Sequence, residues 1–131
     1  MMEDIPLYLL PSTLAVCRLP ADSAFPEWAR PGDLLAFLQT RQELSVICEE
    51  RYVPPEIKAE RGWRALEVQG PLDFTMVGVL ASILDPLREA GVSILALSTF
   101  DTDYVLVKDS SLDPALLALQ AAGFTIITPQ K

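Results

Sequence analysis

Two short polar segments in the second half of the chain carry residue types that could bind a small charged molecule. The first is Gly70-Pro71-Leu72-Asp73-Phe74, which lies between a strand-like and a helix-like run. Free backbone N–H groups and the helix dipole at a helix N-terminus favour an anion such as an α-carboxylate. Asp73 stands at the N-cap position, where its own carboxylate can accept those N–H groups. The segment is therefore either an anion site or a capped strand-to-helix turn.

The second polar segment is Ser98-Thr99-Phe100-Asp101-Thr102-Asp103. Its two aspartates offer carboxylates to an ammonium or guanidinium group through charge-assisted hydrogen bonds, and its three hydroxyl side chains add further polar groups. The ring of Phe100 could stack on a guanidinium, and Trp63 and Tyr104 could form further walls. The structural alternative is a polar β-turn rich in Asp and Thr.

The elements around these segments predict that the two lie at the same end of a sheet. Trp63–Gln69 alternates apolar and polar residues, as a half-buried strand does. A helix is expected from Phe74 to Ala90, with Pro86 inside it and Gly91 as its stop. The apolar run Val92–Leu97 is typical of an interior strand, and Tyr104–Val107 returns as another.

The end of the chain predicts one more helix and one more strand. Asp113-Pro114 is a typical helix start, Gly123 ends that helix, and Phe124–Thr128 is a strand at a sheet edge. Residues 61–131 therefore read βαββαβ, an α+β arrangement of an antiparallel sheet with two helices on one face.

The first half has similar strands but much shorter helical pieces. Strands are expected at Leu7–Leu10 and Thr13–Arg18, followed by a proline-rich loop with at most one helical turn over residues 19–32. A hairpin across Arg41-Gln42 joins two more strands, and residues 52–61 form a connector. We expect two domains, residues 1–60 and residues 61–131.

Three runs of the sequence resemble a known family. KAERGW, WRALEVQGPLDF and LREAGVSILALSTFDTDYVLV are similar to small bacterial proteins made of two ACT-type domains. Those proteins are themselves similar to the regulatory domains of aspartate kinases and to the cytosolic arginine sensors of animal cells. The resemblance implies a tandem ACT-like, ferredoxin-like fold that binds an amino acid between domains or subunits. It places the ligand carboxylate at the amides of residues 72–74, and the amino group at Ser98 or Thr99 backbone oxygens or at Asp101.

The composition excludes several classes of function. Eighteen acidic against ten basic residues give a net charge of −8, which disfavours nucleic acid and anionic membranes. The chain has no histidine, so Ser-His and Cys-His nucleophile pairs and histidine zinc sites are excluded. Cys17 and Cys48 lie in apolar runs and are interpreted as small buried hydrophobes. We expect no catalysis, no metal and no cofactor.

These observations together favour a regulatory or sensor module that binds an amino-acid effector. The alternative is a structural or protein-interaction module of the same fold without a small ligand. The acidic start MMEDIP and the lack of an apolar run of ~18 residues favour the cytoplasm. The helix at residues 74–90 is apolar around most of its circumference, which predicts a symmetric homodimer through that helix.

Overall fold

In the computed structural model of the chain, residues 5–69 and 78–129 are described, and they divide into two compact units. Unit 1 consists of residues 1–11 and 64–131, and unit 2 is Ser12–Trp63. The chain therefore begins in unit 1, leaves it to build unit 2, and then returns. This differs from the expected division at residue 60, because strand β1 (Leu7–Leu9) pairs with the C-terminal part of β5 (Ala59–Val68).

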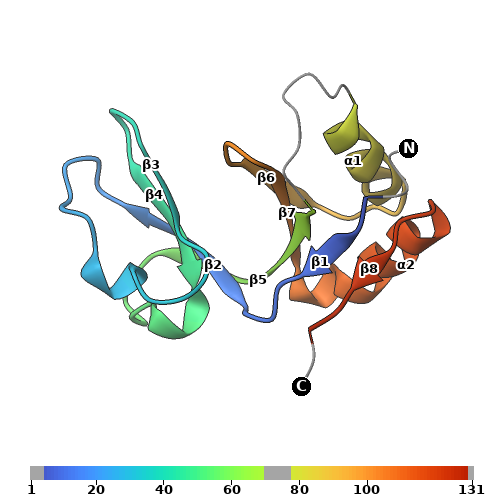
Figure 1. Cartoon of the computed structure of the whole chain (residues 1–131). Coiled ribbons are helices and arrows are strands. Elements are labelled where there is room, and N and C mark those ends of the chain that lie inside the picture. The colour runs from blue at the N-terminus through green and yellow to red at the C-terminus, as the bar shows by residue number, and fades with distance from the viewer. Residues whose placement is uncertain (1–4, 70–77, 130–131) are drawn as a thin grey trace. The chain divides into compact units, whose positions relative to one another are not determined.

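The sheet of unit 1 follows the order β6-β7-β5-β1-β8, as Figure 1 labels the strands. Its remaining strands are β6 (Ile94–Ser98), β7 (Asp103–Lys108) and β8 (Ile126–Ile127). Strand β1 runs antiparallel to β5 but parallel to β8. The expected antiparallel sheet is therefore mixed, because the first strand of the chain lies between β5 and β8. The predicted βαββαβ order from β5 onwards is confirmed.

Two helices cover one face of this sheet (Figure 1). They are α1 (Val79–Glu89) and α2 (Leu112–Ala121), which contact each other; a short 3-10 turn, η4 (Asp109–Ser111), precedes α2. Alternate strand residues and one side of each helix share one apolar core, which includes Leu7, Leu66, Val68, Val105 and Val107 from the strands and Ile83, Leu87 and Leu119 from the helices. Burying each such side chain contributes about 1.5–3 kcal/mol. The residues between them, such as Tyr8, Glu67 and Tyr104, project to the face without helices.

The ends of α1 are set by two glycines. Gly78 has a φ of 86°, a left-handed conformation that stops the helix from extending further toward the N-terminus. The described helix thus begins at Val79, and the predicted start at Phe74 lies outside the described residues. Gly91 has a φ of 74°; its N–H donates to Arg88 O and that of Val92 to Leu87 O, both at 3.0 Å. This is a Schellman motif, and it confirms the predicted stop.

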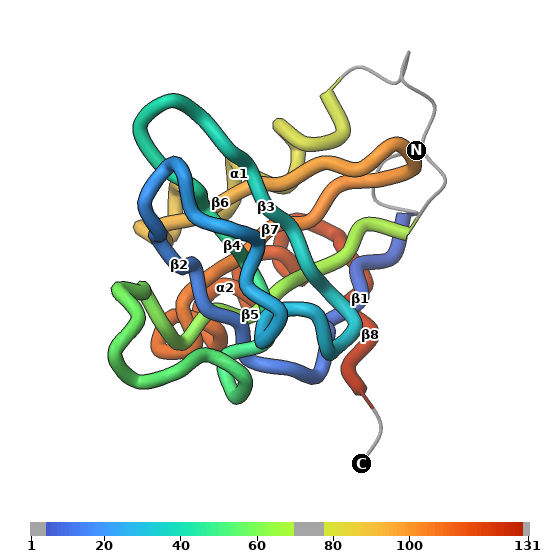
Figure 2. The backbone as a smooth tube through the Cα atoms, turned by 90° about the vertical axis from the view of Figure 1, so that its left-hand side faces the viewer, coloured from blue at the N-terminus to red at the C-terminus, as the bar shows by residue number. Residues whose placement is uncertain are grey.

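Unit 2 is an antiparallel sheet in the order β3-β4-β2-β5, to which β5 contributes its N-terminal residues. Its other strands are β2 (Leu14–Leu19), β3 (Ala36–Gln39) and β4 (Leu44–Glu49). The only helical pieces among its residues are the 3-10 turns η2 (Glu27–Ala29) and η3 (Glu50–Tyr52). The Thr40 N–H donates to Glu43 O at 2.9 Å, which confirms the predicted hairpin. Figure 2 shows the chain path of this hairpin. Because β5 begins at Ala59, the predicted connector is shorter than expected.

Both cysteines lie in the core of unit 2 as free, buried thiols, as predicted. The hydrogen bond with the Cys17 thiol and, to a smaller extent, burial raise the pKa of the Cys48 thiol above its ordinary value. The Cys48 thiol therefore stays protonated, and a protonated thiol is a poor nucleophile.

One carboxylate of unit 2 is buried and anchors a loop. Glu49 is 2% exposed; its Oε2 accepts from the Asp33 N–H at 2.8 Å. Its Oε1 lies 3.1 Å from Arg51 Nη2, an ion pair without hydrogen-bond alignment. Gly32 has a φ of 107°, and a Cβ placed there would lie 2.2 Å from Glu49 Oε2. Because glycine has no Cβ, it leaves room for the Glu49 carboxylate to pack against the loop.

The apolar run Val92–Leu97 was predicted to be an interior strand, and this prediction is wrong. Strand β6 stands at the end of the strand order and pairs only with β7 among the described strands. Its side chains are half-buried or exposed because only one face meets the core.

Within residues 5–69 and 78–129, no helix is long and apolar enough to cross a membrane.

Candidate functional site

The turn between β6 and β7 is fixed by its own threonines. The Thr99 N–H donates to Thr102 O at 2.8 Å, and the Thr102 N–H donates to Thr99 Oγ1 at 3.2 Å. The buried Thr102 hydroxyl donates to Val68 O at the end of β5. The turn therefore lies beside the C-terminal end of β5, as predicted. The other predicted segment, Gly70 to Phe74, follows that end of β5 but lies outside the described residues.

The six predicted residues of the turn separate into two groups. Thr99, Asp101 and Thr102 line a hollow on the sheet. Ser98 and Asp103 do not; the Ser98 hydroxyl donates to Asp103 Oδ1 at 2.6 Å, so the two side chains bond each other. Phe100 is also outside the hollow, with 80% of its surface exposed. Half of the predicted turn residues therefore contribute to a concave surface.

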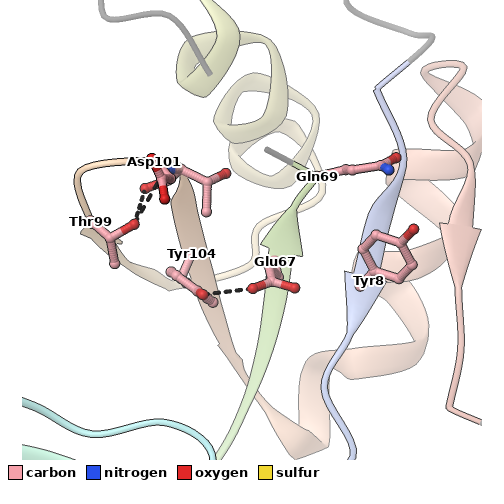
Figure 3. A pocket seen from close by; sticks show the side chains of 7 residues that line it. Tyr8, Glu67, Gln69, Thr99, Asp101 and Tyr104 are labelled. Atoms are coloured by element: carbon pink, nitrogen blue, oxygen red, sulfur yellow. Dashed lines mark hydrogen bonds between the residues drawn. The ribbon is translucent and has the colours of Figure 1, made fainter. Parts of the chain in front are cut away.

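The hollow has a volume of about 490 Å³ and opens on the face of unit 1 without helices (Figure 3). This volume lies within the range of pockets that hold small molecules. Strands β1, β5 and β7 position its side chains together with the turn. The lining residues are Tyr8, Glu67, Gln69, Thr99, Asp101, Thr102 and Tyr104.

Glu67 is held in place by Tyr104. The Tyr104 hydroxyl donates to Glu67 Oε2 at 2.6 Å, as the dashed line in Figure 3 shows. Burial, the hydrogen bond to Glu67 and the negative charge of Glu67 raise the pKa of Tyr104 to about 12. Tyr104 therefore remains a neutral donor at physiological pH. Because the bond engages one carboxylate oxygen, the other remains able to accept from a ligand.

The charge of the hollow is one-sided. Glu67 and Asp101 supply two carboxylates, and no Lys or Arg is among the lining residues that the structure describes. The hydroxyls of both tyrosines and both threonines, and the amide of Gln69, surround them. Such an arrangement suits an ammonium or guanidinium group, for which carboxylates and hydroxyls are acceptors. It does not suit an anion at the same place.

Sequence reasoning missed three of the lining residues. Glu67 and Gln69 were expected on the polar face of their strand, which is the available signal, but they were not assigned to a site. Tyr8 had no such signal, because its strand was assigned to the other domain. Tyr104 lines the hollow as expected, whereas Trp63 is not among the lining residues.

Comparison with known proteins gives the family. A family model of the ACT domain matches residues 58–121, and a second model, which describes an N-terminal domain, matches residues 12–56. Protein Atu0741 from Agrobacterium tumefaciens is 31% identical over 97% of this chain and 95% of that chain, with a TM-score of 0.91. The chain belongs to the ACT-domain family. The predicted ACT-like fold is thereby confirmed.

Two further proteins are similar to this ACT-domain protein. The human cytosolic arginine sensor for mTORC1 subunit 1 is 36% identical over 59 residues, which is 44% of this chain and 18% of the sensor. The chain thus spans less than a fifth of that relative. The regulatory subunit of aspartate kinase from Thermus thermophilus shares the fold, with a TM-score of 0.60 at 12% identity over 88% of this chain and 96% of the other. The first of these proteins is named as a sensor and the second as a regulatory subunit, and the second likeness shows the fold of this chain.

Proposed function

We propose that this ACT-domain protein is a non-catalytic regulatory module that binds an amino-acid effector in the hollow of unit 1. The observation that carries the proposal is the pairing of two carboxylates, Glu67 and Asp101, in a hollow without a basic side chain among its described lining. An amino acid always carries an ammonium group. The hollow offers that group acceptors of the opposite charge, one of which Tyr104 holds in place.

The effector has a preferred orientation in this proposal. Its cationic group faces Glu67 and Asp101, whereas the hydroxyls of Thr99 and Thr102 are engaged by backbone groups of the turn and of β5. Its carboxylate faces the backbone amides of residues 72–74, as the sequence and the family resemblance imply. Arginine is the first amino acid to test, because it carries two cationic groups and is what the named animal relative senses.

Regulation follows if the effector prefers one arrangement of the protein over another. A ligand shifts such an equilibrium only by its difference in affinity between the two states. We propose that this protein acts in the cytoplasm as a homodimer and signals through that shift. The chain has no histidine, and its two cysteines are buried, so the proposal includes no catalytic step.

A thermal-shift screen of the twenty amino acids tests the proposal. A ligand at a hundred times its dissociation constant should add about 2.7 kcal/mol to the free energy of unfolding. The responding amino acid is then titrated by calorimetry against Glu67→Gln, which should weaken binding. The matched control is Asp22→Asn, the same loss of charge at an exposed position of unit 2.

The alternative is a protein-interaction module of the same fold, and one observation favours it. Phe37 and Leu38 on β3 are 60% and 69% exposed, which is unusual for large apolar side chains that are adjacent in sequence. If no amino acid raises the unfolding temperature, this alternative replaces the effector proposal.

A further inference from the structure

The outer edge of β3 in unit 2 lacks the usual protection of an edge strand, although the Phe37 ring contacts the Phe25 ring and the Gln39 side chain donates to Ala21 O. Strand β3 ends the strand order and pairs only with β4 among the described strands. Edge strands are usually protected by charges, prolines or bulges. The run Leu34–Thr40 contains no charge and no proline. Phe37 and Leu38 are largely exposed and, as neighbours in a strand, project from opposite faces.

The hairpin determines which backbone groups of β3 face outward. The bond from the Thr40 N–H to Glu43 O makes those two residues a hydrogen-bonded pair. Bonded and non-bonded pairs alternate along an antiparallel ladder. Leu38 with Ser45 and Ala36 with Ile47 are therefore also hydrogen-bonded pairs. The backbone N–H and C=O groups of Leu38 and Ala36 point toward β4. The backbone N–H and C=O groups of residues 35, 37 and 39 therefore point away from β4, toward the free edge.

We infer that β3 pairs in antiparallel fashion with β3 of a second copy of this chain, with Phe37 on the two-fold axis. Phe37 then faces Phe37 of the second copy, and their outward N–H and C=O groups bond each other. Residue 35 bonds residue 39 of the second copy in the same way. Leu38 packs over Ala36 of the second copy. The contact is isologous, as a two-fold symmetric dimer requires.

Charge selects this register among those that the backbone allows. Outward-facing groups also meet if the axis passes through residue 36 or 38. Asp33 and Arg41 are exposed, and each lies four residues from Phe37. Neither side chain has an ion pair in the described structure. With the axis at Phe37, each Asp33 faces Arg41 of the second copy, and only this register brings both pairs together. The Glu49 carboxylate accepts from the Asp33 N–H, which fixes the backbone from which the Asp33 side chain projects.

Two other surfaces give less support for a dimer contact than β3 does. Strand β6 is also an edge, but its large apolar side chains are only half exposed and no opposite charges flank it symmetrically. The predicted dimer surface on α1 loses its basis for residues 79–89, because their large apolar side chains are buried or half-buried against the core. A single short strand forms a small interface, so we expect a weak, concentration-dependent dimer.

The inference rests on the homodimer in the proposed function, and it is independent of the effector. Sedimentation equilibrium over a range of concentrations measures the dimer dissociation constant. Asp33→Arg should raise that constant by roughly tenfold, because two exposed ion pairs become repulsive. Arg41→Asp should do the same. The double variant Asp33→Arg with Arg41→Asp restores the pairs with reversed sign and should return the constant close to that of the wild type.

Cross-linking tests the register directly. Phe37→Cys places two thiols across the axis at the ~5.5 Å Cα spacing of a bonded pair, which a disulfide accepts. Leu38→Cys is the matched control, because this register separates its two copies along the strand. Oxidation should link the first variant and not the second. The native thiols are buried and so do not compete with the introduced ones. In a separate test that needs no oxidation, Leu38→Lys should weaken the dimer.

Four outcomes would overturn the inference. If the wild-type protein is a monomer at hundreds of micromolar, both the β3 dimer and the proposed homodimer are wrong. A dimer whose constant ignores the charge reversals and Leu38→Lys uses another surface, so only the β3 inference fails. A disulfide through Leu38→Cys moves the axis to residue 38. A Phe37→Cys variant that dimerises but does not cross-link excludes the axis at Phe37. The amino-acid screen reports on the effector whichever of these is found.

Discussion

Glu67 in unit 1 and Glu49 in unit 2 show how the same side chain serves two purposes. Both follow apolar strand residues and both have a neighbour that fixes them. Glu49 is almost fully buried, and the protein engages both of its oxygens, through the Asp33 N–H and Arg51. Glu67 gives one oxygen to Tyr104 and faces a hollow. The first carboxylate is a structural anchor, whereas the second retains capacity for a ligand.

The largest expected effect is that of a methyl group placed against the anchor. Gly32→Ala should lower the free energy of unfolding by about 3–5 kcal/mol, because its Cβ displaces a buried carboxylate from its partners. Gly62→Ala is the matched control. Gly62 also has a positive φ, 80°, but no atom lies within 4 Å of its Cβ position. It should show only backbone strain of about 1–2 kcal/mol. Equal losses in urea denaturation would mean that Glu49 does not confine the loop.

Removing the charge from each carboxylate should separate the two roles. Glu49→Gln should lower the free energy of unfolding by about 1–3 kcal/mol, since it weakens a charge-assisted hydrogen bond in the core. Glu67→Gln should leave the unfolding temperature nearly unchanged and weaken effector binding about tenfold. Denaturation and calorimetry on both variants check this. A large stability loss in Glu67→Gln would place that carboxylate with the structural group.

Alkaline pH should act on the hollow through Tyr104. The folded pKa of about 12 lies above the value of about 10 expected for an unfolded tyrosine. Stability from this difference is fully present below pH 10 and is lost as the pH rises toward 12, by about 1–2 kcal/mol. Tyr104→Phe should remove that part of the pH dependence. Identical slopes of stability between pH 10 and 12 for both proteins would contradict the assignment.

The smallest effect is expected at the exposed rim of the hollow. Asp101→Ala should weaken effector binding by about 0.2–1 kcal/mol and leave the fold intact, because solvent screens an exposed charge. Calorimetry with the responding amino acid measures the change. An unchanged affinity would assign Asp101 to the turn alone.

Local patterns predicted the local structure well. The hairpin across Arg41-Gln42, the Gly91 stop and the polar turn after β6 depend on neighbouring residues, and all three are found. The turn was also expected beside the end of β5, because strand order follows from the βαββαβ pattern. Residues 70–74, the other half of the predicted site, lie outside the described residues and stay a prediction.

The misses have a common physical cause, which is pairing between distant parts of the chain. Nothing in the run around Tyr8 shows that its strand pairs with β5 and β8, so neither the mixed sheet nor the role of Tyr8 could be predicted. Apolar content alone does not separate an interior strand from an edge strand, which explains the error at β6. Gly78 was interpreted as part of a helical face, whereas the described helix begins after it.

The position of β1 between β5 and β8 also has a consequence for the order in which the chain folds. Unit 2 is one continuous stretch, so its contacts can form while the protein is still being synthesised. Leu7 pairs with Ile126, so the sheet of unit 1 closes only after the last described strand has left the ribosome. Until then β1 can pair only with β5 and its other edge has no partner, and such long-range closure is slow. Trimming residues 5–11 should therefore leave unit 2 foldable but deprive the hollow of Tyr8 and one of its supporting strands.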